Sequence, residues 1–414
     1  MLPLPLPLPL PLPLLLLACE PARPGVEPQA EVNEELPGDT SPPTEDTGEE
    51  PADDYDGIYS PTEVHLVDIE LSDEAKRLLR RTPQEYVEGA VSVDGERFER
   101  VGVRLKGSGS FQDLNGKAAF KLDFNRFVPD QSFHGKGKLT LNNMLHDATQ
   151  VHEVVAYAAF AAAGLPYSRV GYAWVTVNDV EYGLYSNVET ADRDYMERHF
   201  GHREGNLYEG GYPYYPDSWN HADFTPAEAE YFQLESGSDV QWADVHSVIT
   251  AMKADDLDGE LSKVVDLDQY VRFQLVEAWT GQWDGYAFAS NNYRIYFDHG
   301  GTGLMSMVPT GLDYCFTSGE SRLARASSPL GAACQGDEVC RARFTAMLDE
   351  TLAKVDAAEL TELMRTTSAF IEPWVSRDPR GYVNVGRTLD TDLRQMEEWV
   401  ESRSAQVDTW YRRE

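Results

Sequence analysis

The stretch WDGYAFASNNYR, residues 283–294, and the later GLDY, residues 311–314, decide how this sequence is interpreted. Asp284 follows a tryptophan and precedes Gly-Tyr, and a pair of asparagines comes shortly after it. Asp313 then stands at the far end of an apolar run. The order along the chain is therefore acid, amides, hairpin and second acid.

Phosphoryl transfer needs side chains of this kind in this order. Asp284 can accept the proton of the attacking hydroxyl, and Asn291 or Asn292 together with Asp313 can hold Mg²⁺ on the phosphates. Kinase-fold enzymes carry a catalytic Asp, a metal-binding Asn and a metal-binding Asp in the same order. Taken singly, each of these residues can also be explained as an ordinary turn or hairpin-capping residue.

The periodicity of the apolar residues predicts an α+β fold with a β-rich first half and a helix-rich second half. Several of the expected strands are joined by tight turns in an antiparallel meander. The expected strands are 63–70, 86–93, 99–106, 118–124, 170–177, 181–189, 292–297 and 304–308. Expected helices are 73–81, 149–163, 191–200, 241–253, 267–282, 338–373 and 389–411. Residues 202–240 are rich in Tyr, Gly and Pro and are expected to be mostly loops.

The N-terminus is predicted to be a targeting segment rather than part of the fold. Residues 2–14 alternate Pro and Leu, and the following Leu16-Leu17-Ala18-Cys19 is similar to a bacterial lipobox, in which Cys19 becomes lipidated. The interpretation is a signal peptide with lipobox at 1–19, which makes the protein an exported cell-envelope lipoprotein, periplasmic or on the outer surface. The alternative is a low-complexity Pro-Leu tract without a targeting role.

Composition divides the remaining chain in two. Residues 20–60 are acidic, rich in Pro and nearly free of large aliphatic residues, so they are predicted to be a disordered tether. Residues 61–414 are rich in aromatic residues and can bury a large core. The net charge of −35 argues against nucleic acid as a partner, because phosphate binding needs a basic face.

The cysteines beyond Cys19 allow more than one pairing. A Cys334–Cys340 disulfide would close a small loop and leave Cys315 free, and a Cys315–Cys334 bridge is the alternative. No CxxC motif or nearby pair of histidines supports a zinc site.

Short motifs spread along the chain resemble those of the spore-coat protein H (CotH) kinase family. VGVRLKG at 101–107 resembles the family's opening motif, and FKLDF at 120–124 resembles its lysine-bearing strand. Further matching segments are 141–143 with Asp147, 164–166, 177–178, 182–185, Glu189, 205–208, 284–286 and 291–292. Each motif is weak alone, and their order and spacing together make the resemblance specific.

The resemblance implies an atypical protein-kinase-like bilobal fold that uses ATP and Mg²⁺ or Mn²⁺. By analogy with the family, Asp284 is the catalytic residue, and Asp313 with Asn292 or Asn291 forms the metal site. The cofactor-binding residues implied by the resemblance are Lys121 on the ATP phosphates, Arg104 and Lys106 beside a glycine-rich turn, Glu153 as a partner of Lys121, and Glu189 at the hinge or adenine side.

Two positions depart from the family pattern. Members usually end the hairpin with Pro-Trp-Asp-x-Asp, whereas this chain has PTGLD at 309–313, so Gly311 stands where an Asp is usual. His152 stands where an Arg often precedes the glutamate at 153. If Asp313 is the essential metal ligand the site is intact, and if the lost Asp is essential the chain is a pseudokinase.

The leading functional hypothesis is an exported kinase that phosphorylates Ser or Thr on surface or secreted proteins and is held at a membrane by a lipid on Cys19. The alternative is a non-catalytic surface-binding or adhesin-like protein built on the same fold. A weaker third hypothesis is a structural envelope component.

Overall fold

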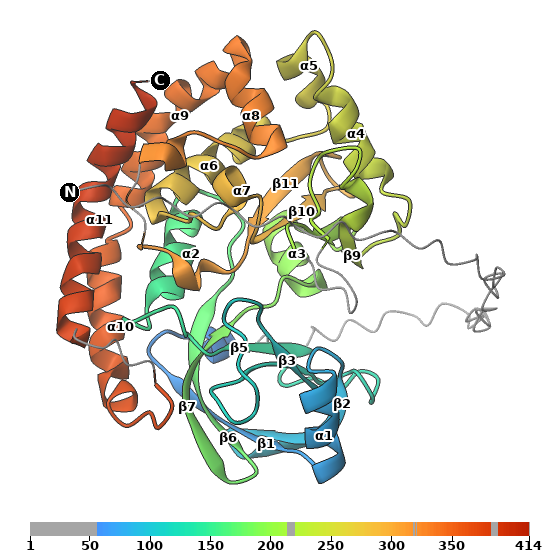
Figure 1. Cartoon of the computed structure of the whole chain (residues 1–414), viewed down its shortest axis with the longest axis vertical. Helices are drawn as coiled ribbons and strands as arrows, with labels where there is room; N and C mark the ends of the chain where they lie inside the picture. Colours follow the sequence, from blue (N-terminus) through green and yellow to red (C-terminus); the bar gives the residue numbers. More distant parts are fainter. Residues whose placement is uncertain (1–55, 213–219, 318, 320, 382–387, 414) are drawn as a thin grey trace, which may run out of the picture. The chain divides into compact units, whose positions relative to one another are not determined.

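The computed structural model describes residues 56–212, 220–317, 319, 321–381 and 388–413 (Figure 1). The predicted signal peptide and nearly all of the predicted tether lie outside these residues. The first described element is a 3₁₀ helix, η1 (Asp56–Tyr59), in which Ile58 and Tyr59 are buried. The described structure therefore includes residues 56–60, which composition assigns to the tether.

The first half of the chain forms a closed barrel of seven strands in the order β1-β2-β3-β4-β5-β7-β6 (Figure 1, blue to green). Its strands are β1 (Val64–Glu70), β2 (Val87–Val93), β3 (Glu96–Lys106), β4 (Ala119–Asp123), β5 (Lys138–Asn142), β6 (Val170–Val177) and β7 (Val180–Val188). Neighbouring strands are antiparallel except β1 and β6, whose parallel pairing closes the barrel. Closure leaves no free edge in this sheet.

Side chains on alternate positions of the strands point inward and fill the barrel interior. In β1, Val67 and Ile69 are buried while Leu66 is half exposed, as expected for a strand with one face on a core. The helix α1 (Asp73–Arg81) follows directly and begins where the Ser72 hydroxyl accepts a hydrogen bond from the amide of Ala75. The predicted meander of 86–93, 99–106 and 118–124 is present as β2, β3 and β4.

A second sheet has the order β11-β10-β8-β9. Its strands are β8 (Asn206–Glu209), β9 (Gln233–Ser236), β10 (Tyr293–Phe297) and β11 (Met305–Pro309). The expectation that 202–240 consists mostly of loops is wrong at β8 and β9. Each is only four residues long, too short to show an alternating pattern, and each is defined by its pairing with a neighbouring strand.

The other α-helices of the described residues follow β5 in the sequence. They are α2 (His152–Ala162), α3 (Arg193–Phe200), α4 (Ala243–Ala251), α5 (Leu257–Leu261), α6 (Leu267–Thr280), α7 (Tyr286–Ala289), α8 (Pro329–Gly336), α9 (Glu338–Asp356), α10 (Leu360–Val375) and α11 (Leu389–Tyr411). The predicted continuous helix at 338–373 is two helices, because the chain turns at Glu359, whose φ is 50°. Within the described ranges, no helix combines the length and apolar character needed to cross a membrane. The α+β class, with strands first and helices later, is confirmed.

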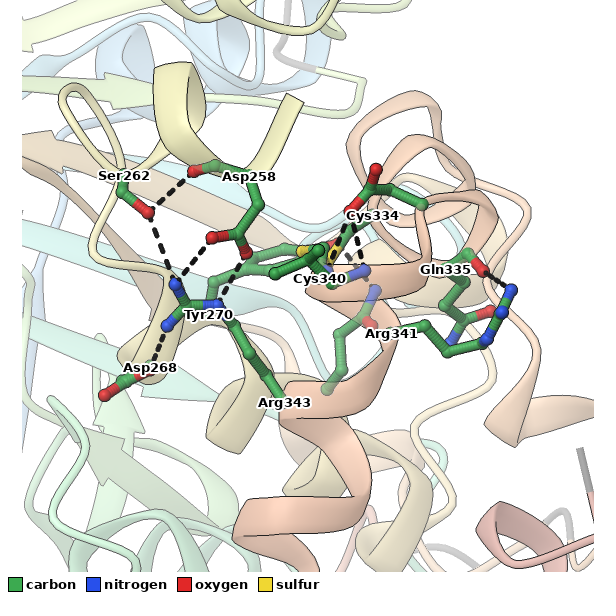
Figure 2. The surroundings of a disulfide bond; sticks show 12 residues. Asp258, Ser262, Asp268, Tyr270, Cys334, Gln335, Cys340, Arg341 and Arg343 are labelled. Carbon is green, nitrogen blue, oxygen red and sulfur yellow. Dashed lines mark hydrogen bonds and ion pairs between the residues drawn. A yellow bond between two sulfur atoms is a disulfide. The ribbon is translucent and has the colours of Figure 1, made fainter. Parts of the chain in front are cut away.

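A disulfide between Cys334 and Cys340 links α8 to α9 (Figure 2). This is the predicted pairing that closes a small loop and leaves Cys315 free. Cys315 is free and buried. Close to the disulfide, Arg343 of α9 binds Asp258 through two nitrogens, at 2.7 and 2.9 Å, and Asp268 at 2.8 Å. These contacts fasten α9 to α5 and to the start of α6.

Candidate active site

The turn that carries Asp284 is built by the helix before it. α6 ends at Thr280, the next residue, Gly281, has the left-handed conformation with φ 69°, and a new helix, α7, starts at Tyr286. The carboxylate of Glu277, near the end of α6, accepts hydrogen bonds from the amides of Tyr286 (2.7 Å) and Ala287 (2.9 Å). A buried acid thus satisfies the free amides at the start of α7 and fixes the turn that presents Asp284.

The side chains of the two predicted asparagines form hydrogen bonds with the carboxylate of Asp284. The side-chain amide of Asn292 donates to its carboxylate at 2.9 Å and to its backbone carbonyl at 3.0 Å, and that of Asn291 donates to its other carboxylate oxygen at 3.2 Å. Burial raises the pKa of Asp284, the charge of Asp313 raises it further, and the two amide hydrogen bonds oppose the shift. The structure therefore brings the acid, the amides and the second acid together.

Asp313 lies on a short 3₁₀ turn, η3 (Leu312–Tyr314), and is positioned by α2. The ring of His152 donates from Nδ1 to the backbone carbonyl of Asp313 at 2.9 Å. His152 is placed in turn by Asp147, whose carboxylate accepts the His152 amide at 2.7 Å and also the amides of Thr149 and Gln150. The histidine that departs from the family pattern thus connects the start of α2 with the metal-ligand candidate.

Position 311 has no room for the aspartate that is usual in the family. Gly311 has φ 62°, and a Cβ added to it would lie 2.7 Å from Oδ1 of Asn292. An L-residue with a side chain is strained in this conformation and would displace the Asn292 amide. In this chain the glycine and the asparagine accommodate each other.

Predicted cations stand side by side on two barrel strands. Arg104 of β3 is the register partner of Lys121 of β4, and Lys106 follows two residues after Arg104 on the same face. Arg104 donates to Gln84 at 2.9 Å and lies over the ring of Tyr86. All three cations are half-buried, so they are partly desolvated while still reachable from solvent.

Glu153 is linked to Lys106 rather than to Lys121. The ammonium of Lys106 donates to Oδ1 of Asn142, and the amide of Asn142 donates to both carboxylate oxygens of Glu153, at 2.8 and 3.0 Å. Ser186 donates to the same carboxylate at 2.5 Å. Across the described part of the chain, Lys121 makes no hydrogen bond or ion pair, so the expected Glu153–Lys121 pair is not found.

Burial shifts the titration of both groups. The pKa of Lys121 is lowered to about 8 by burial and by the charge of Arg104. The pKa of Glu153 is raised to about 7 by burial and by the charge of Asp313, against the hydrogen bonds from Ser186 and Asn142. The charge of Asp313 also raises the pKa of Lys106, although burial lowers it more. The charge of Asp313 therefore acts both on Asp284 and on Lys106 of the barrel.

Glu189 is held in a different environment. Its carboxylate accepts hydrogen bonds from Arg169 at 3.1 and 2.5 Å and from Arg198. The cavity that it borders, next to Tyr59, has a volume of about 10 Å³, room for a water molecule but not for a base. The structure does not bring Glu189 into contact with the other predicted site residues.

Sequence reasoning missed an ion pair beside the site. Arg294 of β10 donates to Glu209 of β8 at 3.3 Å, and the charges of Arg294 and Glu209 both act on Lys121. Cross-strand pairing of β8 with β10 creates this ion pair. Arg294 belongs to the quoted stretch 283–294, but no local pattern shows that its partner lies in a segment expected to be loops.

The oxygen donors of the site fit a hard divalent cation. Asp313 offers a carboxylate and Asn292 an amide oxygen that accepts no hydrogen bond from any described residue, and oxygen ligands are those that Mg²⁺ prefers. Over the same residues, no group of three or more His, Cys, Asp or Glu side chains that could hold a metal is found. A cation here would therefore depend on carboxylate, amide and phosphate oxygens together.

The family described as CotH kinase protein matches residues 103–407, more than half of the chain. The inner spore coat protein H of Bacillus subtilis (strain 168) is 23% identical over 300 residues, which cover 67% of this chain and 79% of that protein. A solved chain from the HipA–HipB–operator DNA complex of Shewanella oneidensis MR-1 is 14% identical, covers 74% of this chain and 66% of its own, and has a TM-score of 0.29. By its match to the family over these residues, the chain belongs to the CotH kinase protein family.

Proposed function

We propose that this protein is an exported atypical protein kinase that transfers the γ-phosphate of ATP to Ser or Thr hydroxyls of surface or secreted proteins. The observation that carries the proposal is the contact of Asp284 with Asn292, close enough to Asp313 for the two acids to interact. Asp313 also interacts with Lys106, one of the cations presented by the barrel. An acid, an amide, a second acid and phosphate-binding cations are the groups that phosphoryl transfer uses.

Each group has a role in the proposed reaction. Asp284 accepts the proton of the attacking hydroxyl, and its two asparagine neighbours hold the carboxylate in one orientation. Arg104, Lys106 and Lys121 bind phosphate oxygens. Asp313 and Asn292 would hold Mg²⁺ or Mn²⁺, which neutralises charge on the phosphates when it is bound.

The proposed setting is the cell envelope. Cys19 would carry the lipid, the acidic segment after it would hold the folded part away from the membrane, and the partners would be proteins rather than nucleic acid. The Cys334–Cys340 disulfide supports export, because such bonds persist in oxidising compartments. The net charge of −35 supports the exclusion of nucleic acid.

Gly311 favours a second candidate, a surface-binding protein that has lost catalysis. The chain carries one acid in the turn, at 313, and the close approach of Asn292 prevents an aspartate at 311 without rearrangement. A pseudokinase would keep the fold and the ion-pair network while binding a partner on its surface.

Calorimetry separates the two candidates. The full-length chain is titrated with ATP in the presence of Mg²⁺ or Mn²⁺, beside Asp313→Ala and a control variant, Asp390→Ala, whose side chain is 81% exposed at the start of α11. The kinase proposal expects metal-dependent binding that Asp313→Ala loses and Asp390→Ala keeps. Folded wild-type protein that binds no nucleotide with either metal would contradict it and favour the surface-binding role.

A further inference from the structure

Arg294 is a cation placed inside the fold with few partners. It lies on β10 between Tyr293 and Ile295, which are buried in the core, so its side chain projects from the opposite face of the sheet. Its register partners are Glu209 on β8 and Val308 on β11. The side chain is 16% exposed, which is low for an arginine.

The donors of Arg294 are largely unused. A guanidinium carries five N–H donors, and here one nitrogen, Nη2, contacts Glu209 at 3.3 Å. Nε is buried and has no hydrogen-bond partner among the residues that the structure describes. Arg343 offers a contrast within this chain, because it binds Asp258 and Asp268 through all three nitrogens. Arg294 is therefore buried like a structural arginine but lacks a structural arginine's hydrogen bonds.

Arg294 also adds positive charge to a place that already has it. After burial and Arg104, the charge of Arg294 contributes to lowering the pKa of Lys121, and it lowers that of Lys106 as well. The charges of cations on β3 and β4 of the barrel thus act together with that of a cation on the second sheet. Glu209 is 35% exposed, and although burial raises its pKa, the charges of Arg294 and Lys121 bring it below the usual value.

Convergent cations with unused donors indicate an anion with several charges. Glu209 contacts Arg294 by one long hydrogen bond, and the charge of Glu235 also acts on Arg294. Neither acid satisfies the other guanidinium donors by a hydrogen bond among the described residues. A planar guanidinium matches two oxygens of a phosphate, and charge-assisted bonds of this type are among the strongest in proteins. A polyphosphate could reach Lys121 with one phosphate and Arg294 with another.

We propose that Arg294 binds phosphate in this site and that the phosphate belongs to the polyphosphate chain of a nucleotide. Glu209 binds the guanidinium of Arg294 when no nucleotide is bound. The inference rests on the proposed kinase function and adds a binding residue to it. Glu209 then acts as a competitor of the phosphates for Arg294. Removing the arginine weakens binding, and removing the competing carboxylate strengthens it.

The test uses the full-length chain and two probes, inorganic tripolyphosphate and ATP with Mg²⁺, in calorimetric titrations. The variants are Arg294→Ala, Arg294→Lys and Glu209→Gln. Arg97→Ala is the matched control, because Arg97 is an arginine on β3 that is 43% exposed and pairs with Glu70 and Glu99 outside the site. Circular dichroism verifies that each variant is folded.

Opposite shifts are expected from the two sides of the ion pair. Arg294→Ala weakens tripolyphosphate binding about tenfold or more, Arg294→Lys recovers part of it, and Arg97→Ala leaves it unchanged. Glu209→Gln tightens binding, which keeps the inference testable even if Arg294→Ala does not fold.

Each other outcome has a distinct meaning. Equal binding by wild type, Arg294→Ala and Glu209→Gln overturns the role of Arg294 and leaves the kinase proposal standing. Arg294-dependent binding of tripolyphosphate without binding of ATP supports the phosphate site and contradicts the kinase proposal. Wild-type protein that binds neither probe overturns both.

Discussion

Asp378 holds the loop between β3 and β4 in place, and its removal should be costly. Its carboxylate is fully buried and forms an ion pair at 2.7 Å with the ammonium of Lys117, whose side chain is 5% exposed. It also accepts the amide of Leu184 at 3.0 Å. A Cβ at Gly183, which has φ 99°, would overlap the carboxylate, so the glycine makes the close approach possible. The neighbouring Arg380 lies 3.6 Å from the centre of the Tyr182 ring and donates to backbone carbonyls of the same loop.

The perturbation is Asp378→Asn, which keeps the shape and removes the charge. Breaking a buried pair leaves Lys117 as an unpaired buried cation, and this costs about 3–5 kcal/mol in the free energy of unfolding. Burial lowers the pKa of Lys117 and the Asp378 carboxylate opposes this effect. Without Asp378 the folded state binds the Lys117 proton still more weakly than the unfolded state, so the variant's deficit should shrink as the pH rises.

Urea unfolding followed by circular dichroism measures this cost at several pH values. Lys117→Met combined with Asp378→Asn should recover most of the loss, because no buried charge is left unpaired. Glu70→Gln, which breaks an exposed pair with Arg97, should leave stability close to wild type. A loss below about 1 kcal/mol for Asp378→Asn, or no recovery in the double variant, would show that the Lys117–Asp378 pair does not stabilise the fold.

Three further predictions concern titrating side chains. The pKa of Glu153 is raised to about 7, so near neutral pH the folded state binds a proton that the unfolded state releases. The free energy of unfolding should therefore fall as the pH rises toward about 7. Glu153→Gln should remove this fall in urea unfolding curves, and an unchanged pH profile would contradict the assignment. The pKa of Lys121 is lowered to about 8, so nucleotide affinity measured by calorimetry should decrease by up to about tenfold for each pH unit above about 8. Lys121→Arg should remove this decrease. Equal pH profiles for the variant and wild type would exclude Lys121 as a phosphate ligand. Cys315 is fully buried and its thiol pKa is raised well above the usual value, so mass spectrometry should find it alkylated only after unfolding; rapid alkylation of the native protein would contradict its burial.

Much of the arrangement of the candidate site was predictable because its residues lie in strong local patterns. Asp284 and the asparagines after it are close in sequence, and a short turn brings them into contact. The hairpin of β10 and β11 then places Asp313 near them. The pairing of Cys334 with Cys340 was one of two predicted alternatives. The short connection between α8 and α9 brings the two cysteines together in this pairing.

Other parts depend on contacts that no local pattern encodes. The His152–Asp313 hydrogen bond joins residues 161 positions apart, and the Lys117–Asp378 pair joins residues 261 positions apart. β5 was missed because Lys and Gly residues precede it, and it is stabilised by pairing with β4 and β7. The partner of Glu153 was predicted incorrectly for a similar reason: Asn142, on this unpredicted strand, connects Glu153 to Lys106.

The most direct test of the central claim is transfer of labelled phosphate from γ-labelled ATP to a serine-rich acceptor protein, with Mg²⁺ or Mn²⁺. Asp284→Asn is compared with wild type and with Asp390→Asn, which changes an exposed acid at the start of α11. Wild type and Asp390→Asn are expected to label the acceptor's hydroxyls, and Asp284→Asn is expected to lose about a hundredfold or more of this transfer. No transfer by folded wild-type protein, or undiminished transfer by Asp284→Asn, would contradict the kinase proposal.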